Sequence, residues 1–230
     1  MRYDITNIPV GEIFEEKDGC PICRLRNKLE QRAVEYITGA AMMEPDIRME
    51  TNRLGFCLPH YRQMLGRHNR LGVALMLESH LAETEKRVFS GTPLIGKSAA
   101  RQAKDANRVG ETCFVCRQVD SAMEKMLATV CRTYEQQADF RRLFEEQPCL
   151  CLPHFSALAE TAQTAMGKKE RGDFTRAARR LAQEYLSELR GDIRHFCEMY
   201  DYQNSGEGAD WGNSRDAVER AVWYLTTRQP

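Results

Sequence analysis

Two short cysteine motifs, each present twice, are the parts of this chain best suited to chemistry. One motif is Cys-x-x-Cys, and the other is Cys-Leu-Pro-His, which recurs letter for letter. Cys-Leu-Pro-His begins 34 positions after the preceding cysteine pair in one copy and 35 positions after it in the other. The residues are Cys20, Cys23, Cys57, His60, Cys113, Cys116, Cys151 and His154. Two sets of three thiols and one imidazole at this spacing predict two tetrahedral Zn²⁺ sites.

The order of the motifs suggests which ligands share an ion, because each repeat carries one motif of each kind. The first site would use Cys20, Cys23, Cys57 and His60. The second site would use Cys113, Cys116, Cys151 and His154. Cys149 lies two residues before Cys151 and could replace it as a ligand, although alignment of the repeats favours Cys151.

Each motif is expected at the start of a helix. Positions i and i+3 lie on one side of the first helical turn, so both ligands of a motif can face the same ion. Three thiolates around a dipositive ion leave a net charge of −1, which the dipoles and free N–H groups of two helix N-termini stabilise. Such a site would close a helical hairpin with an apparent free energy on the order of 10 kcal/mol, comparable with the stability of a whole domain. A closed set of four protein ligands indicates structural sites.

Pairing within a repeat limits the length of the helix that follows each Cys-x-x-Cys motif. An unbroken helix from Pro21 to Met43 would end ~34 Å from the ion, at ~1.5 Å per residue. The residues before Cys57 could not return over that distance if they formed helical turns themselves. We therefore expect the first helix to stop or bend near Gly39, and a break in the second repeat before about Tyr134.

Two other chemistries use similar motifs. A dithiol redox motif of the thioredoxin or glutaredoxin kind expects a preceding strand within a βαβ pattern, which neither copy has. An iron–sulfur cluster could accept three cysteines and one histidine, but all-cysteine ligation is the norm for clusters. Of the remaining cysteines, Cys131 is expected in the core, and Cys197 with His195 is a minor alternative for a third metal site. The sequence has no glycine-rich phosphate loop, Gly-x-Ser-x-Gly elbow or His-Glu-x-x-His motif.

Apolar residues recur at intervals of three and four through most of the chain, which predicts helices. No stretch of useful length alternates with period two, so we predict an all-α protein. The predicted architecture is two tandem helical repeats, each held together by a zinc ion, followed by a C-terminal helix. We place the first repeat at residues 1–95, a linker at residues 96–111, and the second repeat with its helical extension at residues 112–230.

Composition argues against several classes of protein. The 230 residues include 33 Lys+Arg and 33 Asp+Glu, so the chain lacks the basic excess typical of a dedicated nucleic-acid binder. No apolar run approaches the roughly 20 residues of a membrane-spanning helix, and the N-terminal sequence does not resemble a signal peptide. Nine cysteines without an export signal favour a reducing compartment, and we expect a cytoplasmic protein.

The chain resembles a family of uncharacterised bacterial proteins that is classed only as a domain of unknown function. The resemblance rests on Cys20-Pro21-Ile22-Cys23, on Gly55-Phe56-Cys57-Leu58-Pro59-His60, on Asp201-Tyr202, and on Trp211 followed by a short helix. It covers nearly the whole chain, although the second copy has Phe114-Val115 in place of Pro-x and Cys149-Leu150 in place of Gly-Phe. The resemblance implies a fold and a bound metal but no activity.

These observations predict a zinc-binding helical scaffold for protein interaction or regulation. The apolar stripes along its long helices and its amphipathic C-terminal helix would bind a protein partner or a second copy of the chain. Two alternatives stay open. One is a redox sensor whose zinc thiolates release the metal on oxidation. The other is a metal-dependent enzyme, which the closed ligand set argues against, because a catalytic zinc normally keeps one coordination position open.

Overall fold

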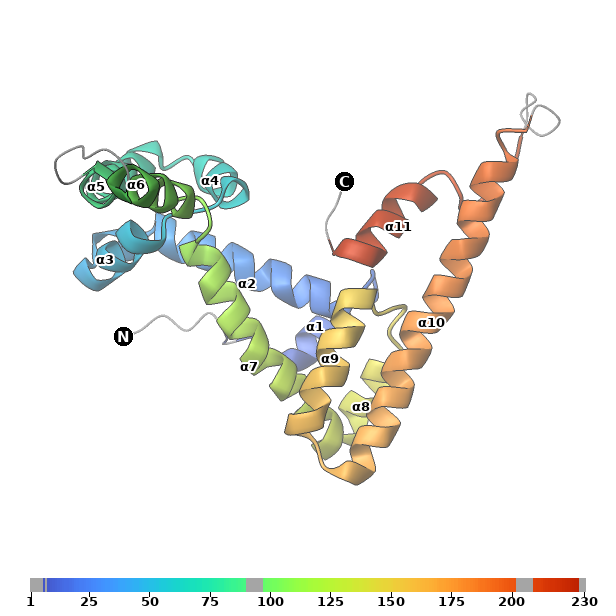
Figure 1. The fold of residues 1–230 in the computed structure, drawn as a ribbon. Helices are drawn as coiled ribbons and strands as arrows, with labels where there is room; N and C mark the ends of the chain where they lie inside the picture. The colour runs from blue at the N-terminus through green and yellow to red at the C-terminus, as the bar shows by residue number, and fades with distance from the viewer. Residues whose placement is uncertain (1–5, 7, 90–96, 202–208, 228–230) are drawn as a thin grey trace. The chain divides into compact units, whose positions relative to one another are not determined.

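The computed structural model describes residues 6, 8–89, 97–201 and 209–227, which form a series of helices (Figure 1). No strand occurs among these residues, so the prediction of an all-α fold is confirmed. None of the described helices is both long enough and apolar enough to cross a membrane. In chain order the elements are α1 (Val10–Glu15), α2 (Pro21–Thr38), the 3-10 helix η1 (Ala40–Met43), α3 (Pro45–Leu54), α4 (Leu58–Leu65), α5 (Arg70–Phe89), α6 (Lys97–Arg108), α7 (Phe114–Gln136), α8 (Ala138–Glu145), α9 (Leu152–Ala165), α10 (Lys168–Glu198) and α11 (Ala217–Thr226).

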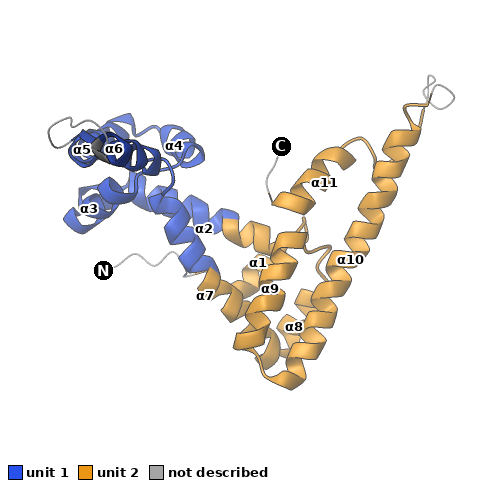
Figure 2. Ribbon diagram, viewed as in Figure 1, with its two compact units in different colours: residues 1–6, 27–123 blue, residues 7–26, 124–230 orange. Residues whose placement is uncertain are grey.

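The chain divides into two compact units (Figure 2). Unit 1 comprises residues 1–6 and 27–123, and unit 2 comprises residues 7–26 and 124–230. These bounds differ from the repeat bounds expected from the sequence. The division between the units falls inside α2 and inside α7, so each of these helices begins in one unit and ends in the other. Residues 97–108, which the sequence placed in a linker, form helix α6 of unit 1.

Unit 1 is built on the second half of α2. Leu29, Ala33 and Ile37 recur every four residues along this helix and are buried, as expected for an apolar stripe that faces a core. Helix α3 packs against α5, and α5 also contacts α4 and α6. Phe56, just before α4, packs edge-on against Phe114 at the start of α7 with 6.3 Å between ring centroids. The beginnings of α4 and α7 therefore lie close together.

Gly55 directs the chain from α3 towards α4. It caps α3 with φ of 61°, in the left-handed region that favours glycine. A Cβ atom at this position would lie 2.9 Å from His80 Nε2. His80 is itself held by a 2.9 Å contact between its Nδ1 and the carbonyl oxygen of Asn52. Both the backbone conformation and the close approach of His80 therefore require glycine here.

Unit 2 has an aromatic core. Phe14 of α1 packs against Phe140 and Phe144 of α8, and Tyr134 and Phe174 pack against Phe144 with centroid distances of 5.3 and 5.0 Å. Helices α9, α10 and α11 pack against one another. The hydroxyl of Tyr224, buried on α11, donates to the carbonyl oxygen of Ala182 on α10 at 2.9 Å. The packing of α9 against α10 and α11 places α9 in unit 2.

Candidate metal centres

All four cysteine motifs stand at helix N-termini, as the sequence predicts. In each motif the carbonyl oxygen of the first cysteine accepts the first hydrogen bond of its helix, which is the N-cap position. The four N-cap cysteines are Cys20 before α2, Cys57 before α4, Cys113 before α7 and Cys151 before α9. The second ligand of each motif follows three residues later, so both side chains face the same side of the first turn.

The four motifs meet in two clusters, one in each unit. Site 1, in unit 1, consists of Cys57, His60, Cys113 and Cys116. Site 2, in unit 2, consists of Cys20, Cys23, Cys151 and His154. Within each cluster the four potential ligand atoms lie within 4.8 Å of one another. The structure thus brings together all eight residues that the sequence singles out, and Cys149 belongs to neither cluster.

The pairing of the motifs differs from the sequence prediction. Each Cys-x-x-Cys pair meets the Cys-Leu-Pro-His motif of the other repeat, because α2 begins beside α9 in unit 2 while α7 begins beside α4 in unit 1. Site 1 uses ligands between residues 57 and 116, and site 2 uses ligands at residues 20–23 and 151–154. Site 1 is therefore nested in the sequence between the two halves of site 2.

The exchanged pairing also explains the length of α7. This helix continues past Tyr134 to Gln136, so the break expected before about Tyr134 does not occur. That limit assumed that the chain must return from the end of α7 to Cys113. In the structure the chain leads instead through α8 to Cys151, which belongs to site 2, and no return is needed. Helix α2 does end at Thr38, as predicted, but its two ends also serve different units.

The distances in site 1 fit a tetrahedral ion. The Sγ atoms of Cys57, Cys113 and Cys116 lie 3.0, 3.2 and 3.5 Å from His60 Nδ1. The Sγ atoms of Cys57 and Cys116 lie 3.8 Å apart. With Zn–S of ~2.3 Å and Zn–N of ~2.0 Å, a regular tetrahedron separates two sulfurs by ~3.8 Å and a sulfur from a nitrogen by ~3.5 Å. The donor set of site 1 therefore has both the composition and the spacing of a zinc site.

Site 2 has the same spacing. The Sγ atoms of Cys20, Cys23 and Cys151 lie 3.7, 3.3 and 3.1 Å from His154 Nδ1. The Sγ atoms of Cys23 and Cys151 lie 3.7 Å apart. Three of the four residues are buried and Cys23 is half-buried, so the site is more enclosed than site 1, where Cys57 and Cys116 are both half-buried.

Protonation within the clusters also favours a bound cation. Burial acts to raise the pKa of Cys113, but the hydrogen bond with His60, the backbone hydrogen bonds and the charge of His60 together lower that pKa to about 6. Burial and the neighbouring charge of Cys113 raise the pKa of Cys116. In site 2, contacts with Cys151 and Cys20 raise the pKa of Cys23, whereas the pKa of Cys20 is lowered. Several thiols this close cannot all ionise without a cation, and a dipositive ion would replace the protons that they retain.

A carboxylate contacts the second ring nitrogen of the histidine of site 1. His60 Nε2 lies 2.6 Å from Glu30 Oε1 of α2. Although burial alone would lower the pKa of His60, hydrogen bonds with Cys113 and Glu30 raise it to about 10. A carboxylate on one ring nitrogen fixes the tautomer and leaves the other nitrogen free for a metal. The sequence prediction missed Glu30, since no motif links it to His60 thirty positions away.

The remaining cysteines stay outside the clusters. Cys131 is fully buried in the core, as predicted. Cys149 is buried, and burial together with the nearby Cys20 and Cys151 raises the pKa of Cys149 to about 12. Cys197 is exposed, and the Nε2 atom of His195 lies 2.9 Å from the carbonyl oxygen of Asp210. Among the described residues, no third group of three or more potential ligands accompanies sites 1 and 2.

Comparison with known proteins places the chain in a family. No curated protein matches it, and no solved structure matches it. One family model matches residues 1–230, which is the whole chain, and its description is a family of unknown function. This match agrees with the resemblance carried by the Cys-Pro-x-Cys and Gly-Phe-Cys-x-x-His motifs. The chain therefore belongs to DUF6062, a family of unknown function.

Proposed function

We propose that this protein is a helical scaffold held together by two structural Zn²⁺ ions, one in each unit. The observation that carries the proposal is the geometry of the two clusters. Each offers three sulfurs and one imidazole nitrogen, with sulfur–nitrogen distances of 3.0–3.7 Å that match a tetrahedron of zinc dimensions. Thiolate and imidazole donors in this arrangement favour zinc over ions that prefer oxygen ligands.

The ligand sets support a structural role. Four protein donors at each site would complete a tetrahedron and leave no position for a substrate or an activated water, which a catalytic zinc requires. Each set also lies at two helix N-termini, where partial positive charge and free N–H groups stabilise the net charge of −1. The sites thus suit ions that hold helices together.

Each ion would join helices that are distant in the sequence. Site 1 would link the starts of α4 and α7, and site 2 would link the starts of α2 and α9. A cross-link of this kind offsets the conformational entropy of ordering the long intervening chain. Zinc binding in small peptides supplies on the order of 10 kcal/mol, as much as a typical domain has in net stability. We infer that each unit depends on its ion to fold.

An exposed apolar stripe supports a role in protein interaction. Val218, Val222 and Leu225 of α11 are exposed and follow helical spacing along one side of the helix. Such a stripe suits a protein partner or a second copy of the chain.

All nine cysteines are free thiols in the structure, which fits the reducing conditions of the cytoplasm that we propose as its location.

Metal analysis of the purified protein tests the proposal. We expect two zinc ions per chain by elemental analysis, and X-ray absorption should show an average of three sulfurs and one nitrogen around each ion. Zinc coordination that includes water or carboxylate oxygen would contradict the structural role. A chain that folds with no metal at all would contradict the proposal as a whole.

Partial exposure of the thiols favours a second candidate function, a redox sensor. Cys57 and Cys116 of site 1 and Cys23 of site 2 are half-buried, so small oxidants could reach them. Oxidation of zinc-bound thiolates releases the ion. This candidate predicts reversible zinc release on treatment with hydrogen peroxide, followed with a zinc-responsive dye, and recovery after reduction and resupply of zinc. Retention of both zinc ions under mild peroxide would contradict the sensor function and leave only the scaffold function.

A further inference from the structure

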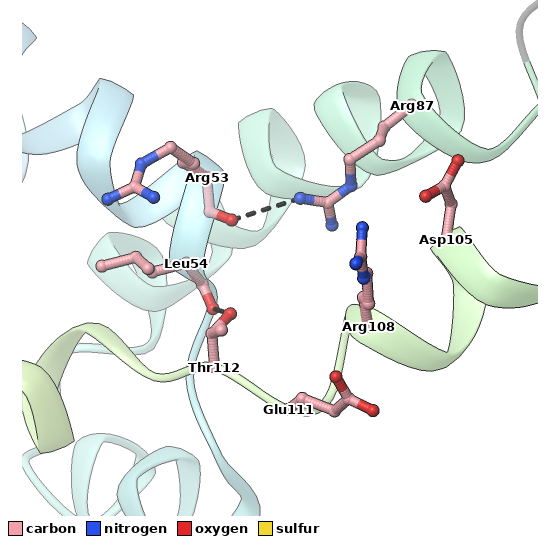
Figure 3. A pocket seen from close by; sticks show the side chains of 7 residues that line it. All are labelled: Arg53, Leu54, Arg87, Asp105, Arg108, Glu111 and Thr112. Atoms are coloured by element: carbon pink, nitrogen blue, oxygen red, sulfur yellow. Dashed lines mark hydrogen bonds between the residues drawn. The ribbon is translucent and has the colours of Figure 1, made fainter.

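Unit 1 contains a pocket of about 290 Å³ whose lining includes no metal ligand. The pocket lies between the C-terminal ends of α3 and α5, the helix α6, and the segment that precedes Cys113 (Figure 3). It is lined by Arg53, Leu54, Arg87, Asp105, Arg108, Glu111 and Thr112. Three arginines in so small a lining make it a candidate binding site for an anion.

Two of the arginines direct their guanidinium groups into the pocket. Figure 3 shows Arg87 and Arg108 pointing into it, while the guanidinium of Arg53 points away. Arg87 Nη1 donates to the carbonyl oxygen of Arg53 at 3.2 Å, which holds the Arg87 side chain at the end of α3. Arg87 Nε is buried and has no hydrogen-bond partner among the described residues. The Arg108 side chain also makes no hydrogen bond or ion pair with another described residue, so its guanidinium donors are unpaired.

Among the described residues, the acidic side chains of the lining form no ion pair with these two arginines. Asp105 forms an ion pair with Arg101 at 3.8 Å, on its own helix. Within the described part of the chain, neither Arg87 nor Arg108 forms an ion pair with a carboxylate. Glu111 also lines the pocket, has no ion pair with a described residue, and adds a negative charge that opposes an incoming anion. The described part of the chain therefore supplies no paired counter-ion to the guanidinium groups of Arg87 and Arg108.

We propose that this pocket binds a small phosphate-bearing anion. A guanidinium group forms paired, charge-assisted hydrogen bonds with phosphate oxygens. Two guanidinium groups that face the same space offer more such donors than the two oxygens of one carboxylate can accept in pairs. The volume of about 290 Å³ is just below the range of typical ligand pockets, which is about 300–1,000 Å³. The pocket therefore suits inorganic phosphate or a small phosphate monoester.

The pocket wall continues directly into site 1. Thr112 Oγ1 donates to the carbonyl oxygen of Leu54 at 2.7 Å, and the N–H of Phe114 donates to the carbonyl oxygen of Gly55 at 2.9 Å. These two bonds join the segments that carry Cys57 and Cys113. An ion at site 1 would hold the same segments together, so zinc should strengthen phosphate binding, and phosphate should strengthen zinc binding equally. This coupling rests on the proposed function, whereas the pocket itself does not.

Calorimetric titration of the full-length protein tests the pocket. Inorganic phosphate and glycerol phosphate are titrated in a buffer without other multivalent anions, with acetate and glycerol as comparison ligands. We expect saturable binding of one phosphate probe molecule per chain and much weaker binding of acetate. No saturable binding of either phosphate probe, or acetate binding of equal affinity, would overturn the proposal.

Matched variants separate the pocket from general charge effects. Arg108→Gln should weaken phosphate binding at least about tenfold, because it removes a charged donor to an anion. Glu111→Gln should strengthen binding, because it removes the unpaired negative charge of the lining. Arg179→Gln, an exposed arginine of α10 in unit 2, should leave binding unchanged. Equal weakening by Arg108→Gln and Arg179→Gln would show only non-specific attraction and would overturn the site.

Folding and metal content are measured on the same samples. Arg108 is exposed, so Arg108→Gln should retain the melting temperature of the parent protein. Phosphate binding by a chain without zinc would refute the structural zinc proposal and support the pocket. Two bound zinc ions without phosphate binding would refute the pocket alone.

Discussion

At the scale of residues, cysteine replaces the usual N-cap side chains. Ser, Thr, Asp and Asn are preferred at N-caps because their side chains accept a hydrogen bond from the first turn. Cys57 and Cys151 occupy N-caps without any such side-chain bond. The loss of a cap costs about 1 kcal/mol. A metal that binds the same sulfur would more than offset this cost, which is consistent with cysteine at these positions.

Removal of one ligand should affect one site only. Cys57→Ser should reduce the zinc content from two ions to one, because site 2 draws no ligand from residues 57–116. Cys151→Ser should likewise remove the ion of site 2. Cys149→Ser is the matched control, since Cys149 lies outside both clusters and both ions should be retained. Elemental analysis checks the three variants; loss of an ion in Cys149→Ser would mean that Cys149 is a ligand.

Glu30 should increase the zinc affinity of site 1 without being a ligand. Replacement of a carboxylate that supports a metal-bound histidine typically lowers metal affinity by about 10–100-fold. We expect Glu30→Gln to lower the zinc affinity of site 1 by about tenfold and to leave site 2 unchanged, because Glu30 contacts His60 and not His154. Competition with a zinc chelator measures both affinities. An equal loss at both sites would indicate a general change in folding instead.

At the scale of elements, short turns deliver the ligands to their helices. Gly55 ends α3 and leads within two residues to Cys57. Thr112, hydrogen-bonded to Leu54, leads directly into Cys113. The two turns are joined to each other, so the starts of α4 and α7 are held in place by backbone contacts as well as by any ion.

A side chain at Gly55 should weaken this arrangement. Gly55→Ala places a Cβ atom 2.9 Å from His80 Nε2 and forces a non-glycine residue to adopt a φ of 61°. We expect destabilisation by about 1–3 kcal/mol, measured by chemical denaturation. Gly191→Ala is the control, because Gly191 lies within α10 with open space around it. That substitution should stabilise the protein by up to about 1 kcal/mol. Similar effects of the two changes would contradict this account of Gly55.

At the scale of the whole molecule, the sequence repeat and the compact units do not coincide. Unit 2 takes residues 7–26 from the start of the chain and residues 124–230 from its end, and unit 1 lies between them in the sequence. Cys20 and Cys23 belong to the first repeat by motif but to unit 2 by contact. Folding of unit 2 therefore requires both ends of the chain.

Fragments should fold according to the units. A fragment of residues 27–123 contains all four ligands of site 1 and should bind one zinc ion and melt cooperatively. A fragment of residues 1–95 has only half of each site, so it should not melt cooperatively with or without zinc. Circular dichroism with and without a chelator checks both. Cooperative, zinc-dependent folding of the 1–95 fragment would support pairing within a repeat and contradict the structure.

The local features of this protein were predictable from its sequence. The all-α fold and the helix starts after Cys20, Cys57, Cys113 and Cys151 follow from apolar periodicity and from the motif at each helix start. The end of α2 near Gly39 was predicted as well, but on the assumption of pairing within a repeat, which the structure does not have. The ligand residues follow from the i, i+3 spacing in each motif. Such features involve neighbours in the sequence, and local rules are sufficient for them.

Only the tertiary structure decided which motifs meet. The two Cys-x-x-Cys pairs have the same donor chemistry, as do the two Cys-Leu-Pro-His motifs, so no local property selects between pairing within a repeat and pairing across repeats. The paths of α2 and α7 from one unit to the other make that choice. Glu30 behind His60 and the facing guanidinium groups of Arg87 and Arg108 depend on the same packing. These contacts join residues whose proximity arises from the packing of helices, which the spacing of the motifs does not encode.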